Sequence, residues 1–445
     1  MRENHGLVLR RKVKVSFAKL VGSMVSQALS GHGTLGQHLR AVSGVNISDE
    51  AAMQRRASLS WEWFEALFGQ VLRPRAKLKE HPESFYCGHR LLGVDGTAWS
   101  LRNTEAILSQ QQRSRHRNGQ KEAAFYKWGT AVLLELGTHQ PLSVARALPK
   151  EDRTEGELNI ARRTLGAIPN KEDTLLLADR LYGCGRFICD VQQAAGPRAQ
   201  VLVRVSSLRQ TTVLRALSDG SALVETGLYE PGANRPSGVL QVREIRGEVW
   251  RQNTTQDKQK LSDTSGHQKP EPERTEVRLW TTLLDEKAHP AEALLKLYAQ
   301  RWEQELFFGE LKSRTANHSL LRAASLQGAE AEFGALILAA NLLAGERLKA
   351  AQSVGLAPVR LSIKKIGYAL EALQPMLQAA EGIITEQQRQ RIVAKFLVQM
   401  AREAVIKKRR SRSCQRGVRK PQCSWPRIHT RTVCEGPFAF KVIAS

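Results

Sequence analysis

The stretches RLLGVDGT (residues 90–97) and TLLLADR (residues 174–180) decide the fold that the sequence predicts. Each is a short apolar run that reaches an aspartate, Asp95 in the first and Asp179 in the second. Short apolar runs that end at turn-forming residues predict buried strands. If these two strands are neighbours in one sheet, their carboxylates lie together in one cleft.

The segments around these two stretches complete a pattern of strands and helices. Further strands are predicted at residues 131–136, 142–147 and 200–205, and helices at 155–168 and 184–194. Three strands, a helix, a strand, a helix and a strand is the element order of an RNase H-like core. Because helices separate the strands only in the second half, the sheet is predicted to be mixed.

The fold class is therefore α/β: an RNase H-like mixed sheet flanked by helices, with a β-rich insertion domain and helical N- and C-terminal regions. The insertion is predicted from apolar runs at 222–227, 239–245 and 277–284, with a long polar loop at 253–274. From His289 almost to Ala404 the pattern is helical. The predicted domains are an N-terminal helical domain (1–84), the core (85–206 and 285–347), the β-rich insertion (207–284) and a C-terminal helical region with a basic tail (348–445).

The first domain is predicted to be a small helical bundle with basic residues on its outside. Apolar residues repeat at helical spacing from Phe17 to Leu29, and Ser48 is a plausible N-cap with acids in the turn behind it. Two interpretations stay open, since this domain could bind DNA ends or could simply carry surface arginines.

The charge of the chain points to a polyanionic partner. Lys and Arg number 67 against 43 Asp and Glu, a net charge of +24. Nucleic acid is the first candidate and an anionic membrane the second. No membrane partner is expected, because the longest apolar run, residues 333–345, is too short to span a bilayer and indicates a buried helix. The tail from Lys407 to Lys420 has eight Lys or Arg and no acid, and it either lies along DNA or is a cationic tail without a defined site.

The six cysteines are sparse and scattered, which fits a reducing cytoplasm rather than a disulfide scaffold. Cys414, Cys423 and Cys434, with His429 nearby, do not have the spacing of a zinc site.

Asp95 and Asp179 are candidate metal ligands. Two carboxylates in one cleft repel each other unless a cation neutralises them, and Mg²⁺ prefers such an oxygen-rich setting. Two ions can clamp the attacking and leaving oxygens of a phosphoryl transfer. The alternative is that each aspartate only caps a turn or a helix.

A predicted helix at residues 294–314 supplies further polar groups. Tyr298, Arg301, Glu305 and Lys312 follow one another at steps of three, four and seven residues, which places them on one helical face. An acid flanked by two bases suits the wall of an active site, with a carboxylate for metal and cations for phosphates. Two other acids share this helix: Glu303 is expected to face elsewhere, and Glu310 does not fit the spacing.

These residues carry a resemblance. The pattern Y-x2-R-x3-E-x6-K resembles the signature of insertion-sequence-4-type DDE transposases at every spacing. A D-G-T block at Asp95, a D-R block at Asp179 and a V-L-V-R strand at residues 201–204 are similar to the other blocks of that family, in the same order. The family often has Gly after D-R, where this chain has Leu181, so the shape of that loop is open.

The resemblance implies that Asp95, Asp179 and Glu305 are catalytic and hold two Mg²⁺ ions, with Mn²⁺ able to substitute. It implies Mg²⁺-dependent cleavage and strand transfer of phosphodiesters at the ends of an insertion element.

The resemblance also implies DNA contacts. Arg301 and Lys312 would contact the backbone near the cut, Tyr298 would brace a phosphate, and Trp302 would stack against DNA at the element end. Arg204 either reaches DNA or pairs with a core acid. Trp280 is interpreted as a core residue in preference to an aromatic DNA contact.

The partners implied are the element ends, target DNA and a second copy of the chain on DNA, in a bacterial, nucleoid-associated cytoplasmic setting. A catalytically inactive DNA-binding derivative and an RNase H-like nuclease that cuts without joining are the alternatives.

Overall fold

The computed structural model describes residues 15–110, 125–148, 155–170, 172–230, 233–250, 274–313 and 320–406. The basic segment 407–420, most of the polar loop at 253–274 and the three C-terminal cysteines lie outside these residues.

The described strands form one mixed sheet. Its order is β4-β3-β2-β5-β6-β10-β9-β8-β7, with the short β1 paired to β2. The bounds are β1 Phe85–Tyr86, β2 His89–Leu101, β3 Tyr126–Glu135, β4 Gln140–Arg146, β5 Thr174–Ala178, β6 Ala199–Arg204, β7 Thr212–Ala216, β8 Ala222–Leu228, β9 Gly238–Trp250 and β10 Arg274–Thr281. Strands β2, β5 and β6 are parallel, and the other neighbouring pairs are antiparallel. The prediction of a mixed sheet is confirmed.

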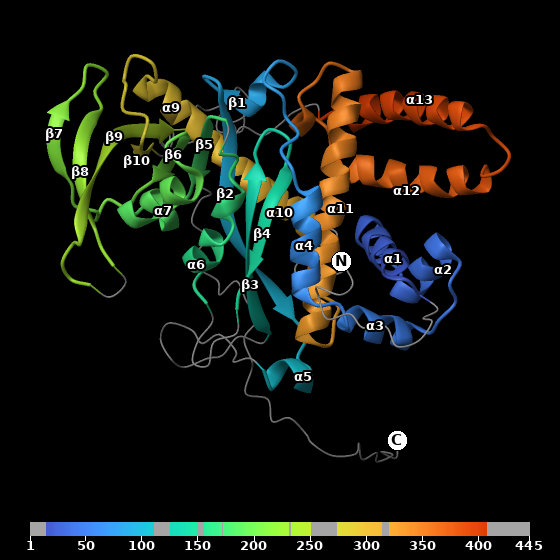
Figure 1. Ribbon diagram of the computed structural model, residues 1–445. Helices are drawn as coiled ribbons and strands as arrows, with labels where there is room; N and C mark the ends of the chain where they lie inside the picture. The colour runs from blue at the N-terminus through green and yellow to red at the C-terminus, as the bar shows by residue number, and fades with distance from the viewer. Residues whose placement is uncertain are drawn as a thin grey trace, which may run out of the picture.

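The strands of the predicted insertion, residues 207–284, continue the same sheet. Strand β10 pairs with the core strand β6, for example Trp280 with Val203, and β9, β8 and β7 follow outward (Figure 1). The region is β-rich as expected, although its edge strand β7 was not predicted. All five residues of β7 are exposed, so the strand has no buried face for a sequence pattern to mark.

Helices and short 3-10 turns surround this sheet. The α-helices are α1 Phe17–Ser30, α2 Leu35–Ser43, α3 Asp49–Ala57, α4 Trp61–Val71, α5 Glu105–Leu108, α6 Glu157–Arg162, α7 Gly185–Ala195, α9 Ala291–Tyr298, α10 Trp302–Lys312, α11 Leu326–Ser353, α12 Ile363–Ala379 and α13 Glu386–Ala404. The 3-10 turns are η2 Pro82–Ser84, η3 Leu165–Ala167, η4 Arg180–Tyr182, η5 Ala299–Arg301 and η6 Pro358–Arg360. The predicted N-cap at Ser48 is confirmed, since its hydroxyl accepts a hydrogen bond from the Ala51 amide at 3.2 Å.

Two glycines of β2 show that helices cover both faces of the sheet. A Cβ at Gly93 would lie 2.8 Å from Oε1 of Gln304 on α10, and a Cβ at Gly96 would lie 2.3 Å from Cγ of Glu157 on α6. Successive residues of a strand point to opposite faces, and these glycines are three residues apart. Helices α10 and α6 therefore lie on opposite faces, and Asp95 points to the face of α10.

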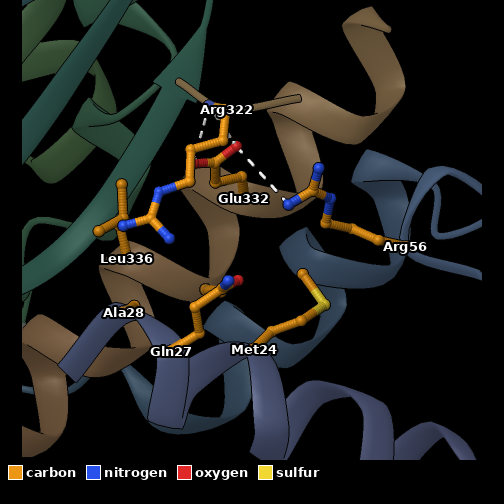
Figure 2. A pocket seen from close by; sticks show the side chains of 8 residues that line it. Met24, Gln27, Ala28, Arg56, Arg322, Glu332 and Leu336 are labelled. Atoms are coloured by element: carbon orange, nitrogen blue, oxygen red, sulfur yellow. Dashed lines mark hydrogen bonds and ion pairs between the residues drawn. The ribbon is translucent and has the colours of Figure 1, made fainter. Parts of the chain in front are cut away.

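Helix α11 joins the sheet to the N-terminal helices (Figure 1). A Cβ at Gly334 would lie 2.4 Å from Phe64, so this glycine lets α4 and α11 approach closely. Figure 2 shows a second contact, where Arg56 of α3 pairs with Glu332 of α11 at 3.7 Å beside a small cavity of about 20 Å³. The N-terminal helices therefore share one core with the sheet.

The length and composition of α11 would allow it to cross a membrane, and it is the one described helix of which this is true. The apolar window of α11 is 83% buried inside the protein, however, as expected for a core helix. The predicted burial of residues 333–345 is confirmed for most of them. Helices α12 and α13 form a hairpin that packs on the C-terminal half of α11 (Figure 1).

Candidate active site

Asp95 and Asp179 are brought together by the register of two parallel strands. The last parallel pair between β2 and β5 joins Val94 to Ala178, and each aspartate is the next residue. The expectation that both aspartates end strands holds for Asp179 only. Strand β2 runs on to Leu101 because Gly96 and the residues after it stay paired with β3. The two aspartates thus lie where the pairing of β5 with β2 ends, although Asp95 itself lies within a strand.

The local backbone holds each carboxylate in place. Oδ1 of Asp95 accepts a hydrogen bond from the Gly96 amide at 2.9 Å, and Oδ1 of Asp179 accepts one from the Arg180 amide at 2.7 Å. Burial and, after it, the nearby Glu157 carboxylate raise the pKa of Asp95 to about 7. A raised carboxyl pKa means that the ionised carboxylate is unfavourable at this place unless it takes up a proton or a cation lies beside it.

The segment that carries the signature residues is helical without interruption from Ala291 to Lys312. The helix predicted at 294–314 is present, although residues 299–301 form the 3-10 turn η5 between α9 and α10. Tyr298 is the last residue of α9, and its hydroxyl donates a hydrogen bond to the Ala178 carbonyl of β5 at 3.1 Å. Burial holds the pKa of Tyr298 well above its usual range, so the phenol stays protonated. Tyr298 therefore fixes the signature segment to the strand that precedes Asp179.

Arg301 lies among the three predicted acids. Its guanidinium is 2.8 Å from Oε1 of Glu305 and 3.9 Å from Oδ2 of Asp95. The side chain is only 12% exposed, and burial would lower its pKa, but the tyrosine and acids around it, Asp179 included, keep the pKa above the usual range. The structure thus brings Asp95, Asp179 and Glu305 around one cation of the chain itself.

Two further predicted residues, Lys312 and Trp302, lie near this centre. Lys312, at the end of α10, donates to the Thr97 hydroxyl at 2.6 Å, and its ammonium lies 5.7 Å from the centre of the Trp99 ring. Trp302 is half-buried, with the Arg301 guanidinium 5.8 Å from its ring centre.

Arg204, the last residue of β6, is half-buried, and its charge offsets a small part of the rise that burial causes in the pKa of Tyr298. No described acid forms an ion pair with it, which leaves the core-pairing alternative without support in the described part of the chain.

Glu157 was missed by sequence reasoning. It begins α6 on the other face of the sheet, packs against Gly96 and accepts a hydrogen bond from the buried Tyr182 hydroxyl at 2.9 Å. It thus adds a fourth carboxylate beside Asp95. A glutamate in the first turn of a helix is ordinary, so only its closeness to Asp95 distinguishes it.

The competing acids of α10 are directed away from this centre, as predicted. Glu303 and Glu310 both contact His139, and Glu310 also pairs with Arg347. The interpretation of Trp280 as a core residue is confirmed as well, since it is fully buried and its indole donates to Glu244 at 3.0 Å.

The donor set fits a hard divalent cation chemically. The acids offer carboxylate oxygens, with no sulfur ligand at the centre, and oxygen ligands are those that Mg²⁺ prefers. In the described residues, no three His, Cys, Asp or Glu side chains lie close enough to share a metal ion. The acids converge on the Arg301 guanidinium instead, so a metal at this centre would have to replace that cation.

Comparison with known proteins shows the family to which the chain belongs. The family model described as Transposase DDE domain matches residues 86–342, more than half of the chain, and the chain belongs to this family. The match spans both aspartate blocks and the segment from Tyr298 to Lys312.

A similar protein acts for an insertion sequence element. The chain is 23% identical over 431 residues to the transposase InsG for insertion sequence element IS4 of Escherichia coli strain K12, covering 95% of this chain and 89% of the relative. The resemblance to insertion-sequence-4-type DDE transposases is therefore confirmed.

Proposed function

We propose that this protein is the DNA transposase of an insertion element, which cuts phosphodiesters at the element ends and joins them to target DNA. The core would be RNase H-like, with Asp95, Asp179 and Glu305 as the catalytic acids. The observation that carries the proposal is that Asp95 of β2 and Glu305 of α10 both contact the Arg301 guanidinium, while Asp179, directly after β5, acts on its charge.

The three acids would hold two Mg²⁺ ions. Bound there, the ions supply activation of water or of a DNA 3′-OH and stabilise the leaving oxygen. Asp95 would lose its proton on binding, since ligand carboxylates must be ionised. Arg301 would leave the acids at the same time, and its planar guanidinium is suited to a phosphate of the bound DNA.

The other signature residues would hold the DNA. Lys312 would contact the backbone beside the cut, and Tyr298 would brace a phosphate from its place against β5. Trp302 offers an aromatic face at the start of α10, where a base at the element end would stack. Arg204, at the end of β6, would reach the same backbone.

Two copies of the chain would act together on DNA in the bacterial cytoplasm, near the nucleoid, because two element ends must be held at once. No membrane partner is proposed. The predicted domains, 1–84, 85–206 with 285–347, 207–284 and 348–445, would divide this work between DNA binding and catalysis.

The first test is cleavage of a supercoiled plasmid that carries the element ends, with Mg²⁺, with Mn²⁺ and with EDTA. Wild type is compared with Glu305→Gln, and Glu292→Gln serves as the control. Glu292 is an exposed acid of α9 that pairs with Lys296, so it shares the segment but not the site. Metal-dependent cutting at the ends that Glu305→Gln loses, and the control keeps, supports the proposal.

Other outcomes of this assay select the alternatives. Tight DNA binding without any cutting by wild type indicates a catalytically inactive DNA-binding derivative. Cutting without joining to a supplied target indicates a nuclease. Cutting that survives Glu305→Gln means that another acid serves in its place.

A further inference from the structure

His139 forms a buried cluster behind the candidate active site that neither the signature nor the proposed reaction uses. It lies in the turn between β3 and β4, is 2% exposed, and has a positive φ of 56°. A positive φ is uncommon for a residue other than glycine and is kept only where the surroundings hold it. The residues around His139 therefore hold it in a defined place.

Both ring nitrogens of His139 contact carboxylates of one helix. Nδ1 lies 2.8 Å from Glu310 and Nε2 lies 2.8 Å from Glu303. An ionised carboxylate only accepts hydrogen bonds, and a neutral imidazole has a single N–H to donate. With both carboxylates ionised, two such contacts at once require a doubly protonated ring. Although burial opposes the charge, the two carboxylates raise the pKa of His139 above its usual range.

The two glutamates lie on the same face of α10, seven residues apart, and the catalytic acid Glu305 lies between them in sequence on another face. Arg347 of α11 completes the cluster. It pairs with Glu310 at 3.0 Å and donates to the Thr138 carbonyl at 2.7 Å. The helix is thus fastened at two points to one imidazole, and that imidazole lies in a turn of the central sheet.

We propose that His139 is a positioning residue for the transposase reaction: by bridging Glu303 and Glu310 it fixes the rotation of α10, and so the direction of Glu305. The proposal rests on the proposed function of Glu305. The charged groups that face His139 are Glu303 and Glu310 from α10 and Arg347 from α11, and the ring of Phe307 packs against it.

A spectroscopic test examines the bridge without any metal or DNA. In the full-length protein labelled with ¹⁵N-histidine, the resonances of His139 are identified by their loss in His139→Gln. Both ring nitrogens should carry protons at pH 8, where a histidine with an ordinary pKa of about 6.5 is neutral. A single protonated nitrogen at pH 8 would overturn the bridge.

A kinetic test examines positioning. His139→Gln should lower the rate of plasmid cleavage about tenfold or more, the usual effect of removing a group that orients a metal ligand. Binding of end DNA should change by less than about threefold. His139→Lys, which restores a cation with several donors, should recover part of the rate. His32→Gln is the control, because His32 also pairs with a glutamate, Glu371, but on the exposed surface.

The outcomes separate this proposal from the proposed function. Unchanged cleavage in His139→Gln overturns positioning, and so does a parallel loss of cleavage and DNA binding, which marks a role in folding alone. If wild type cuts no DNA, the proposed function fails, whereas the resonances of His139 still report on the bridge.

Discussion

Arg301 supplies positive charge to three acids that the proposed reaction assigns to metal. Its guanidinium reaches Glu305 and Asp95 at 2.8 and 3.9 Å, and its side chain is nearly buried. Metal and Arg301 should therefore compete for the same carboxylates.

Replacing Arg301 by Met is expected to lower the free energy of unfolding of the metal-free protein by about 1–2 kcal/mol, because the acids lose their counter-charge. The Tm of the metal-free protein should fall accordingly. The rise in Tm on adding Mg²⁺ should be larger than in wild type, since metal then provides the missing charge. Thermal melts with and without Mg²⁺ measure both effects. Lys296→Met, which breaks the exposed pair with Glu292, is the control. If Mg²⁺ raised the Tm of Arg301→Met by no more than that of Lys296→Met, the result would argue against competition between Arg301 and metal.

The side chain of Glu157 packs so closely against Gly96 that only glycine fits at this position. A Cβ at this position would lie 2.3 and 2.4 Å from Cγ and Cδ of that glutamate. Gly96→Ala should destabilise the protein by about 1–3 kcal/mol, the cost of overpacking, and should reduce cleavage because Asp95 is the neighbouring residue. The double variant with Glu157→Ala should regain most of the stability, which a double-mutant cycle on Tm values measures. Purely additive effects would mean that the two residues do not clash.

At the scale of elements, α10 is held from both sides of its axis. Lys312 ties it to β2 beside Asp95, and Glu303 and Glu310 tie it to the turn after β3. The sequence pattern located the helix and its signature face. It did not predict the contacts on the opposite face of α10, because His139 and Arg347 are distant from this helix in sequence and follow no periodic pattern.

The pair of cations beside Glu310 should make this helix sensitive to acid. Although burial opposes it, Arg347 and His139 lower the pKa of Glu310 to about 2, against an ordinary value of 4.5. A depressed carboxyl pKa stabilises the folded state above pH 4.5, and this contribution is lost as pH falls through 2. Glu310→Gln should therefore have a lower Tm than wild type at pH 6, and the difference should shrink between pH 4.5 and 2. Melts across this range test it, and a constant difference would exclude the linkage.

The helical signature, the aspartate strands and the element order of the core were predictable because each depends on residues close together in sequence. The strand end at Asp95 was not, because pairing with β3 continues past it. The 3-10 turn η5 was also not predicted, since the spacing of the signature residues remains compatible with one helical face.

At the scale of the whole molecule, the net charge of +24 agrees with a protein that acts on DNA. The insertion strands lie at one end of the sheet, and the N-terminal helices and the α12–α13 hairpin lie beyond α11 at the other (Figure 1).

The basic tail provides a prediction at this scale. Deletion of residues 407–420 removes eight Lys or Arg and no acid. Affinity for DNA of any sequence should fall, and the slope of log K against log salt should decrease by up to about 7 if every cation meets a phosphate. Binding titrations at several salt concentrations, with end DNA and random DNA, measure this. An unchanged slope would mean that the tail does not lie on DNA, and a loss confined to end DNA would mean that it reads sequence.

The sequence by itself determined the chemistry: two aspartates after apolar strands, a glutamate between two cations on a helix, and an excess of positive charge. These are local features, set by residue type and by the periodicity of strand and helix. The tertiary structure alone decided which groups surround them. The neighbour of Asp95 is Glu157, the cation among the acids is Arg301, and the support of α10 is His139. Those contacts depend on the register of the sheet and on the packing of helices from distant parts of the chain, which no local pattern encodes.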